Sequence, residues 1–241
     1  MTAVDEKLDF SQQVQTLFGS IAPRYDFLNC LLSCGRDRYW RKQAVSLLDP
    51  AERGRYLDIA TGTADIALEI AGRSLEHIRI NGLDFCYPMV KLGRQKVLDK
   101  ELDKVITFQL GCGENLPFPE NSFNGVISAF GIRNFADVTM GLDEIHRVLK
   151  PGGKTVILEF SLPSKGMIKF IYELYFSKIL PWIGRWISGH RSAYNYLPDS
   201  VSRFPSRSNF ARILENAGFQ DVSFKSLTFG IVTLYSGYKH A

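Results

Sequence analysis

Residues 56–72, YLDIATGTADIALEIAG, contain the pattern that decides the fold. Apolar Leu57 and Ile59 flank Asp58 as in a buried strand, small residues follow at positions 60–64, and apolar residues then recur at helical spacing. A strand that passes through a tight turn into a helix is the opening unit of a nucleotide-binding α/β domain. Two ligands fit such a unit: a dinucleotide held by its pyrophosphate, and S-adenosylmethionine held by its amino-acid end and its ribose.

The rest of the chain continues the alternation of strands and helices. Strands are expected at residues 77–84, 105–111, 123–132 and 154–161, and an amphipathic helix at residues 140–150. This alternation predicts a mostly parallel sheet with helices on both faces. Residues 222–239 hold two more β-rich runs, which predict a C-terminal antiparallel hairpin. The predicted fold class is therefore α/β, the Rossmann-like class I of S-adenosylmethionine-dependent methyltransferases, in which such a hairpin is common.

We predict a single methyltransferase domain over residues 1–241, because a chain of 241 residues with 45% hydrophobic content can bury one substantial core. Two segments lie outside the alternation: an N-terminal helical cap at residues 1–45 and an aromatic-rich insert at residues 162–200. Charged residues and Pro181 interrupt the insert, so it lacks the run of about 18 apolar residues that crosses a bilayer. Two interpretations of the insert stay open, a lid or interfacial element and a pair of ordinary core helices.

Charge and cysteine content argue against several kinds of partner. The net charge of +4 is spread along the chain, which argues against a nucleic-acid partner. The four cysteines are scattered, without a Cys-x-x-Cys pair or a histidine at ligand spacing, so we expect neither a metal site nor a disulfide framework. The N-terminal residues are polar and acidic, unlike a secretion signal, so we expect a cytoplasmic protein with reduced thiols.

The turn at residues 61–65 distinguishes the two ligands. A dinucleotide fingerprint needs Gly-x-Gly-x-x-Gly, but Ala64 stands at the second glycine position and Asp65 sets a carboxylate beside the helix start, where it would repel phosphate. S-adenosylmethionine presents an ammonium and a sulfonium, which suit a carboxylate. Asp84, about 20 residues past the turn, can accept hydrogen bonds from ribose hydroxyls in either case. The turn and the hairpin together favour S-adenosylmethionine.

Several longer motifs resemble one family across nearly the whole chain. They are FGSIAPRYDFLNCLLSCGRDRYWR at residues 18–41, LPFPENSF at 116–123, AFGIRNF at 129–135, RVLKPGGKTVILEFS at 147–161, SAYNYLPDSV at 192–201 and AGFQDVSFKSLTFGIVTLYSGYK at 217–239. The chain resembles the ubiquinone/menaquinone biosynthesis C-methyltransferases, the UbiE/MenG/COQ5 group.

This resemblance implies a set of cofactor contacts, with Thr63 and Asp84 on the cofactor and the pair at positions 112 and 113 against the adenine. The chain departs from the family there, since an Asn or Asp followed by Ala is usual. Asp37 stands where the family has His, Ala64 where many members have Gly, and Ala129 where some have Ser. The candidate cofactor residues are Asp58, Thr61, Gly62, Thr63, Asp65, Asp84, Cys112, Gly113 and Ala129.

The resemblance also implies methylation at a ring carbon of a quinol. Such a carbon becomes a useful nucleophile once a ring hydroxyl is deprotonated, so the site needs a proton acceptor and a group that stabilises the phenolate. Arg133 keeps its charge and offers several donors, which fits the second task, and Asn134 could orient the ring hydroxyl. Tyr25 and Asp26 are candidates to close over the substrate, with Asp26 as an acceptor through water.

The expected partner is an isoprenoid quinol, with the ring or its tail lined by His190, Tyr194 and Tyr196, and peripheral membrane contact is one expectation for such a substrate. We favour demethylmenaquinol over the benzoquinol. Two alternatives stay open: methylation of another lipid-like small molecule, and a degenerate cofactor-binding subunit of a quinone-synthesis complex. The oligomeric state also stays open, with a homodimer among the alternatives.

Overall fold

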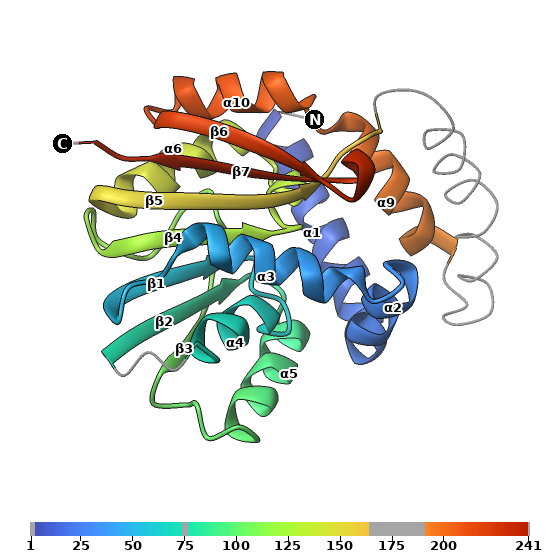
Figure 1. Cartoon of the computed structure of the whole chain (residues 1–241). Helices are drawn as coiled ribbons and strands as arrows, with labels where there is room; N and C mark the ends of the chain where they lie inside the picture. Colours follow the sequence, from blue (N-terminus) through green and yellow to red (C-terminus); the bar gives the residue numbers. More distant parts are fainter. Residues whose placement is uncertain (1–2, 74–76, 164–190, 241) are drawn as a thin grey trace.

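The structure, a computed structural model, describes residues 3–73, 77–163 and 191–240 (Figure 1). Within them the chain forms a seven-stranded sheet of order β3-β2-β1-β4-β5-β7-β6. Its strands are β1 (Arg53–Ile59), β2 (His77–Asp84), β3 (Ile106–Leu110), β4 (Phe123–Ala129), β5 (Leu149–Phe160), β6 (Gln220–Leu227) and β7 (Val232–Tyr238). Strands β1 to β5 pair in parallel, whereas β7 runs antiparallel to both β5 and β6. The predicted fold class and C-terminal hairpin are confirmed.

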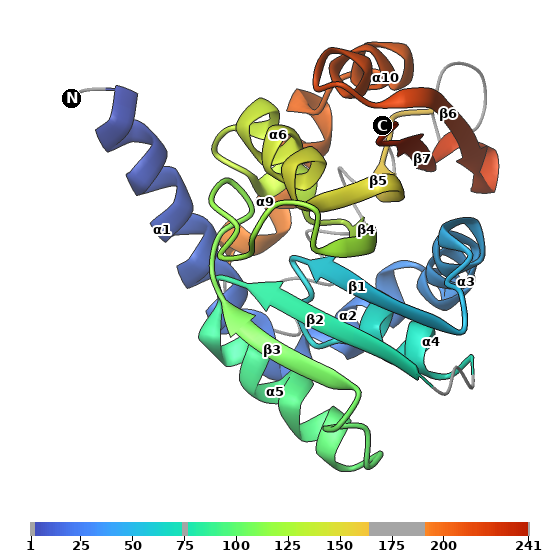
Figure 2. The same cartoon turned by 90° about the vertical axis from the view of Figure 1, so that its left-hand side faces the viewer.

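Helices cover both faces of the sheet (Figures 1 and 2). They are α1 (Ala3–Ile21), α2 (Tyr25–Leu32), α3 (Arg36–Leu48), α4 (Asp65–Ala71), α5 (Tyr87–Leu98), α6 (Val138–Val148), α9 (Arg191–Arg203) and α10 (Arg207–Asn216). Short 3-10 turns lie at η1 (Ala22–Arg24), η2 (Ile132–Asn134) and η4 (Thr228–Gly230). Helices α3, α4 and α5 pack on one face, and α6 and α10 on the other.

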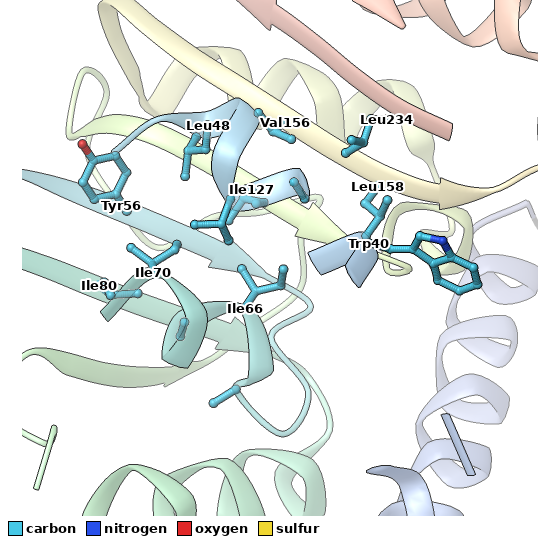
Figure 3. Packing of buried hydrophobic residues seen from close by; sticks show 14 of the residues in the cluster. Trp40, Leu48, Tyr56, Ile66, Ile70, Ile80, Ile127, Val156, Leu158 and Leu234 are labelled. Carbon is cyan, nitrogen blue, oxygen red and sulfur yellow. The ribbon is translucent and has the colours of Figure 1, made fainter. Parts of the chain in front are cut away.

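Two hydrophobic clusters fill these layers because successive strand residues point to opposite faces. In β1, Tyr56 belongs to the cluster under α3 and α4, and its neighbour Leu57 to the cluster under α6 and α10. In β5, Val156 and Ile157 divide in the same way. Figure 3 shows the first cluster, in which side chains from α3 and α4 meet those of the central strands. The sheet is thereby fixed from both sides, and the ends of its parallel strands stay available for a site.

The border between α6 and β5 differs from the expected one. The helix ends at Val148 and the strand begins at Leu149, five residues before the predicted start. Leu149 is fully buried and pairs with Phe123, and the register between β4 and β5 then shifts. Burial of an apolar side chain thus extends the strand back over Pro151, Gly152 and Gly153, the segment between the helix predicted to end at residue 150 and the strand predicted to start at residue 154.

The predicted cap contains helices α1, α2 and α3, but only part of it lies outside the core. Helix α3 continues to Leu48 and contributes Trp40, Ala44 and Val45 to the first cluster. The N-terminal half of α1, in contrast, extends away from the sheet (Figure 2). Residues 164–190 of the predicted insert lie outside the described residues, and α9 follows them. No helix in the described part of the chain is both long and apolar enough to cross a membrane.

Candidate active site

The turn between β1 and α4 has an unusual backbone. Ala60, Gly62 and Ala64 all have positive φ angles, of 55°, 55° and 70°. This left-handed conformation costs an L-residue roughly 1–2 kcal/mol, which is why glycine is common at such positions. The Thr61 N–H donates to the carbonyl of Leu83 at 3.0 Å, so the turn is fastened to β2. The strained backbone is held in place by its surroundings.

Two predicted cofactor residues, Asp58 and Thr61, stabilise this turn through a hydrogen bond. The Thr61 hydroxyl donates to Asp58 Oδ2 at 2.5 Å, and the Asp58 side chain is almost fully buried. Burial raises the pKa of Asp58 to about 7, and the hydrogen bond from Thr61 opposes that rise. Neither residue lines the cavity described below. Their contribution is the shape of the turn.

Asp84, at the end of β2, joins two turns. The first turn lies between β1 and α4, and the second lies between β2 and α5. Its Oδ2 accepts from the Gly62 N–H and its Oδ1 from the Cys86 N–H, both at 2.8 Å. Only 6% of the residue is exposed, and this burial raises the pKa of Asp84. The backbone N–H groups of Cys86, Gly62 and Phe85 oppose that rise, and a carboxylate with about four lone-pair sites still has room for another donor. The side chain is therefore immobilised at the place where two strands end.

A cavity of about 250 Å³ opens at the C-terminal ends of β1, β2 and β4. Phe18 of α1, Leu83 and Phe130 supply apolar walls. The predicted residues that line it are Tyr25, Gly62, Asp84, Cys112, Gly113, Ala129 and Asn134. Those that do not line it are Asp26, Asp58, Thr61, Thr63, Asp65, Arg133 and Tyr196. The cavity thus brings together residues from the cap, from the first turn and from η2.

The departure at position 113 has a packing reason, whereas nothing in the structure explains Cys112. A Cβ on Gly113 would lie 2.1 Å from the ring of Phe135, which is far inside van der Waals contact. The same ring would also meet a Cβ on Gly141 at 2.3 Å. Phe135 itself lines the cavity. The absence of a side chain at position 113 is therefore matched to the aromatic residue that occupies its space.

A cluster of charges connects the cap to the first turn. Lys96 of α5 lies 2.5 Å from Asp26 and 2.8 Å from Asp65, and its Nζ donates to Thr63 Oγ1 at 3.0 Å. The Thr63 hydroxyl in turn donates to Asp26 Oδ1 at 2.6 Å. Sequence reasoning missed Lys96, because a lysine on an amphipathic helix gives no signal of its own. These contacts fasten α2 to the turn.

Arg41 of α3 extends the cluster from the other side. Its Nη1 lies 2.7 Å from Asp37 and 3.2 Å from Asp65, and Asp37 also accepts from the Ser33 hydroxyl at 2.9 Å. Asp37, which departs from the family pattern, is thus the anionic partner of Arg41. The three carboxylates of the cluster, on Asp26, Asp37 and Asp65, outnumber its two cations. The excess negative charge beside the turn suits a cationic ligand and disfavours a pyrophosphate.

Arg133, in η2, is paired with a residue that sequence reasoning also missed. Its Nη1 lies 3.0 Å from Glu159 Oε2, and Glu159 is fully buried at the end of β5. The guanidinium also lies over the Phe160 ring at 5.4 Å and donates to the Phe130 carbonyl. The sequence did contain a signal for Glu159, because a glutamate inside the apolar strand TVILEF needs a partner when it is buried.

Asn134 is oriented by two neighbours. Its Nδ2 donates to the Phe130 carbonyl at 3.4 Å, and its Oδ1 accepts from the Tyr196 hydroxyl at 2.8 Å. Since a carbonyl can only accept, the amide nitrogen must face Phe130. The Tyr196 ring makes an edge contact with Phe18, so α9, α1 and η2 meet here. His190 and the side chain of Tyr194 lie outside the described residues.

The sheet topology and the site together define a protein class. A parallel sheet that ends in an antiparallel pair, with a cavity at the strand ends and an acidic residue closing β2, is typical of Rossmann-like S-adenosylmethionine-dependent methyltransferases. A solved S-adenosylmethionine-dependent methyltransferase from Thermotoga maritima has this fold, with a TM-score of 0.66, 20% sequence identity, and coverage of 93% of this chain and 98% of that one. Phosphoethanolamine N-methyltransferase 2 of Haemonchus contortus, solved with S-adenosylmethionine, matches with a TM-score of 0.62 and 17% identity over 83% of this chain and 52% of that one.

The chain belongs to the ubiE/COQ5 methyltransferase family, whose model matches residues 5–239. It is 49% identical to the ubiquinone/menaquinone biosynthesis C-methyltransferase UbiE of Geotalea daltonii, over 95% of this chain and 97% of that protein. It is 45% identical to the demethylmenaquinone methyltransferase of Deinococcus radiodurans, over 98% and 96%. The resemblance read from the sequence is confirmed, and the protein is a methyltransferase.

Proposed function

We propose that this protein transfers the methyl group of S-adenosylmethionine to a ring carbon of a demethylated respiratory quinol, with demethylmenaquinol as the favoured acceptor. Relatives named for ubiquinone/menaquinone C-methylation and for demethylmenaquinone methylation, matched over nearly their full length, support this assignment. The observation that carries it is the cavity. It is bordered by the polar first turn with Asp84, by aromatic walls and by η2.

The cofactor side of the proposal uses groups at the strand ends. Asp84 would accept from the ribose hydroxyls with its remaining lone pairs, and the Gly62 turn would hold the amino-acid end. Cys112 and Gly113 would lie against the adenine, with backbone or water replacing the side-chain acceptor that the family usually has. Asp58, Thr61, Thr63 and Asp65 would act by keeping the turn in shape. When bound, the cofactor supplies an electrophilic methyl group.

The acceptor side uses η2 and the cap. Asn134 lines the cavity and keeps one amide N–H beyond the one that it donates to Phe130, and Arg133 beside it keeps its Nε donor, so both would stabilise a phenolate oxygen as charge develops on it. Tyr25 would close over the ring, and burial raises its pKa, which favours a neutral phenol. Asp26 is bound to Thr63 and Lys96, so we assign to it the attachment of the cap, and its role as a proton acceptor stays a prediction.

An isoprenoid quinol resides in a lipid bilayer, so we further propose a cytoplasmic protein that contacts the membrane peripherally. Phe27 and Leu31, one helical turn apart on α2, are 60% and 41% exposed, which fits shallow contact with lipid near the cap. Co-sedimentation with vesicles made with and without anionic lipid tests this part. A protein that stays in the supernatant with both would contradict it.

The methyl transfer is tested with purified protein, labelled S-adenosylmethionine and a short-tailed demethylated naphthoquinol or benzoquinol kept reduced by dithionite. We expect incorporation of label into the reduced ring, faster for the naphthoquinol. The oxidised acceptor should not react, because its ring carbons are electron-poor and positioning alone cannot make them nucleophilic. Cofactor binding without transfer to either quinol would contradict the proposal and favour a non-catalytic subunit.

A further inference from the structure

Glu159, a buried residue near the end of β5, contacts the candidate site through Arg133. Its side chain is fully buried, and its carboxylate binds the middle residue of η2, Arg133, twice. Oε1 accepts from the Arg133 N–H at 3.1 Å, and Oε2 accepts from Arg133 Nη1 at 3.0 Å. The Phe160 N–H also donates to Oε2, at 3.2 Å. One side chain thus fixes both the backbone and the guanidinium of Arg133.

These contacts favour a charged carboxylate. Burial raises the pKa of Glu159, while the guanidinium and the N–H donors oppose that rise. Every hydrogen bond made by its oxygens in the described structure is accepted from a donor, so a protonated carboxyl would meet an N–H instead of an acceptor. The pair with Arg133 is therefore an ion pair in a nearly dry environment.

The groups around this pair leave Glu159 as its anionic member. Three phenols interact electrostatically with this pair: Tyr25 of α2 with Arg133, Tyr196 of α9 with both members, and Tyr235 of β7 with Glu159. Burial raises the pKa of each of these phenols, to about 12 for Tyr235, so all three are neutral at physiological pH. Arg203 and Arg207, which act on Tyr196 and Tyr235, are cations. The charge that Arg133 offers to an acceptor is thus set by Glu159.

The pairing leaves the buried Nε donor of Arg133 unused. Only 6% of the Arg133 side chain is exposed, and its Nε is buried without a hydrogen-bond partner in the described structure. Nη1 is engaged by Glu159 and by the Phe130 carbonyl. A buried donor without an acceptor costs about 1–3 kcal/mol, which an oxygen atom of a ligand or a water would remove.

We propose that Glu159 is a positioning residue for methyl transfer, which locks the guanidinium of Arg133 in place behind the cavity-lining residues Phe130 and Asn134 and offsets its charge. This inference rests on the proposed function. The locked guanidinium keeps a donor ready for the acceptor oxygen without reorganisation. The offset of its charge prevents the bare cation from stabilising the phenolate so strongly that its ring carbon loses nucleophilicity.

Glu159→Gln tests the charge, and Glu159→Asp tests the position. Glu159→Gln should lower the maximal kcat at least tenfold and leave the affinity for S-adenosylmethionine unchanged. It should also move the rising limb of the kcat–pH profile about one unit toward lower pH, since an uncompensated cation eases ionisation of the quinol hydroxyl. Glu159→Asp keeps the charge but draws it back by one methylene, so it should lower kcat and leave the pH profile in place.

The control is Glu144→Gln, which breaks another Glu–Arg pair. Glu144 binds Arg147 at 2.6 Å and accepts from the Leu116 N–H at 2.7 Å, and neither Glu144 nor Arg147 contacts η2 or has a proposed role in methyl transfer. It should keep kcat within about twofold of the wild type. A shift of the pH profile in this variant as well would overturn the proposal, because any broken ion pair would then have the same effect.

A double-mutant cycle with Arg133→Leu shows whether Glu159 acts through Arg133. In that background Glu159→Gln should change kcat less than about threefold, and this comparison holds even where the single Glu159→Gln variant does not fold. A further tenfold loss would overturn the proposal, as would a folded Glu159→Gln enzyme with wild-type kcat and pH profile. Failure of the proposed function is distinguishable, because the wild type itself would then transfer no methyl group to either quinol.

Discussion

Replacement of Asp84 by Asn tests the centre of the cofactor site. The substitution preserves size but removes the charge and turns one of the two acceptor oxygens into an NH₂ group. In the structure these oxygens accept from the N–H groups of Gly62 and Cys86, each at 2.8 Å. The amide can satisfy one of these donors, and its NH₂ group then faces the other. Either the first turn or the second loses its anchor.

The expected size of the effect follows from the hydrogen bonds involved. A hydrogen bond to a charged group contributes about 1.5–3 kcal/mol, and the cofactor would lose one from its ribose. This loss corresponds to roughly a 10- to 150-fold increase in the Kd for S-adenosylmethionine. The free energy of unfolding should fall by a similar amount, because a buried N–H is left facing another donor.

Isothermal titration calorimetry with S-adenosylmethionine measures the first effect and thermal unfolding the second. Titration well below the melting temperature keeps the variant folded. Asp221→Asn serves as the control, since Asp221 is exposed and pairs with His240 at 3.0 Å, and it should change neither quantity measurably. If Asp84→Asn melts earlier but binds the cofactor within twofold of the wild type, Asp84 serves the turns alone and the ribose assignment is wrong.

Three further predictions test the proposed acceptor side, the proposed adenine pocket and the first turn. Arg133→Leu should lower kcat about a hundredfold with an unchanged Kd for S-adenosylmethionine in calorimetry, and equal losses in both would instead make it a cofactor ligand. Gly113→Ala should lower the free energy of unfolding by about 1–3 kcal/mol, because the new methyl group meets the Phe135 ring, and pairing it with Phe135→Leu should restore part of the loss in chemical denaturation. Asp58 binds its proton more tightly in the folded state, so the free energy of unfolding should fall by a few kcal/mol, in order of magnitude, as pH rises from 3.8 to about 7. Asp58→Asn should flatten this dependence, and an unchanged slope would contradict the buried titration.

The sheet could be predicted because its signals are local. The period-2 alternation around Tyr56 and Leu57 and the helical spacing after the turn are encoded within 17 residues, and the final hairpin within 18. The start of β5 was predicted too late because a Pro-Gly-Gly segment outweighed Leu149 in a sequence reading. In the folded protein Leu149 is completely buried against β4, and that tertiary contact decides where the strand begins.

Sequence reasoning could predict a residue of the candidate site only where a single acidic side chain at the end of a strand carries the signal. Asp84 is such a residue, and the structure gives it a buried position on the cavity. The charge cluster is different, because Asp26, Asp65 and Lys96 come from three helices and each looks like an ordinary surface charge. Their meeting depends on how α2 and α5 pack, which no short window of sequence contains.

Asp37 shows how a departure from the family pattern can be compensated in three dimensions. Taken alone, a carboxylate where the family has His suggests a weakened signature and favours a degenerate protein. In the structure the carboxylate holds Arg41 at 2.7 Å, and Arg41 reaches Asp65 at the start of α4. Asp37 therefore supplies an anion to a cation that contacts the turn between β1 and α4. A degenerate site would have lost such contacts. Their presence shows that Asp37 takes part in holding the cap against the turn, so this departure is no evidence for a non-catalytic subunit.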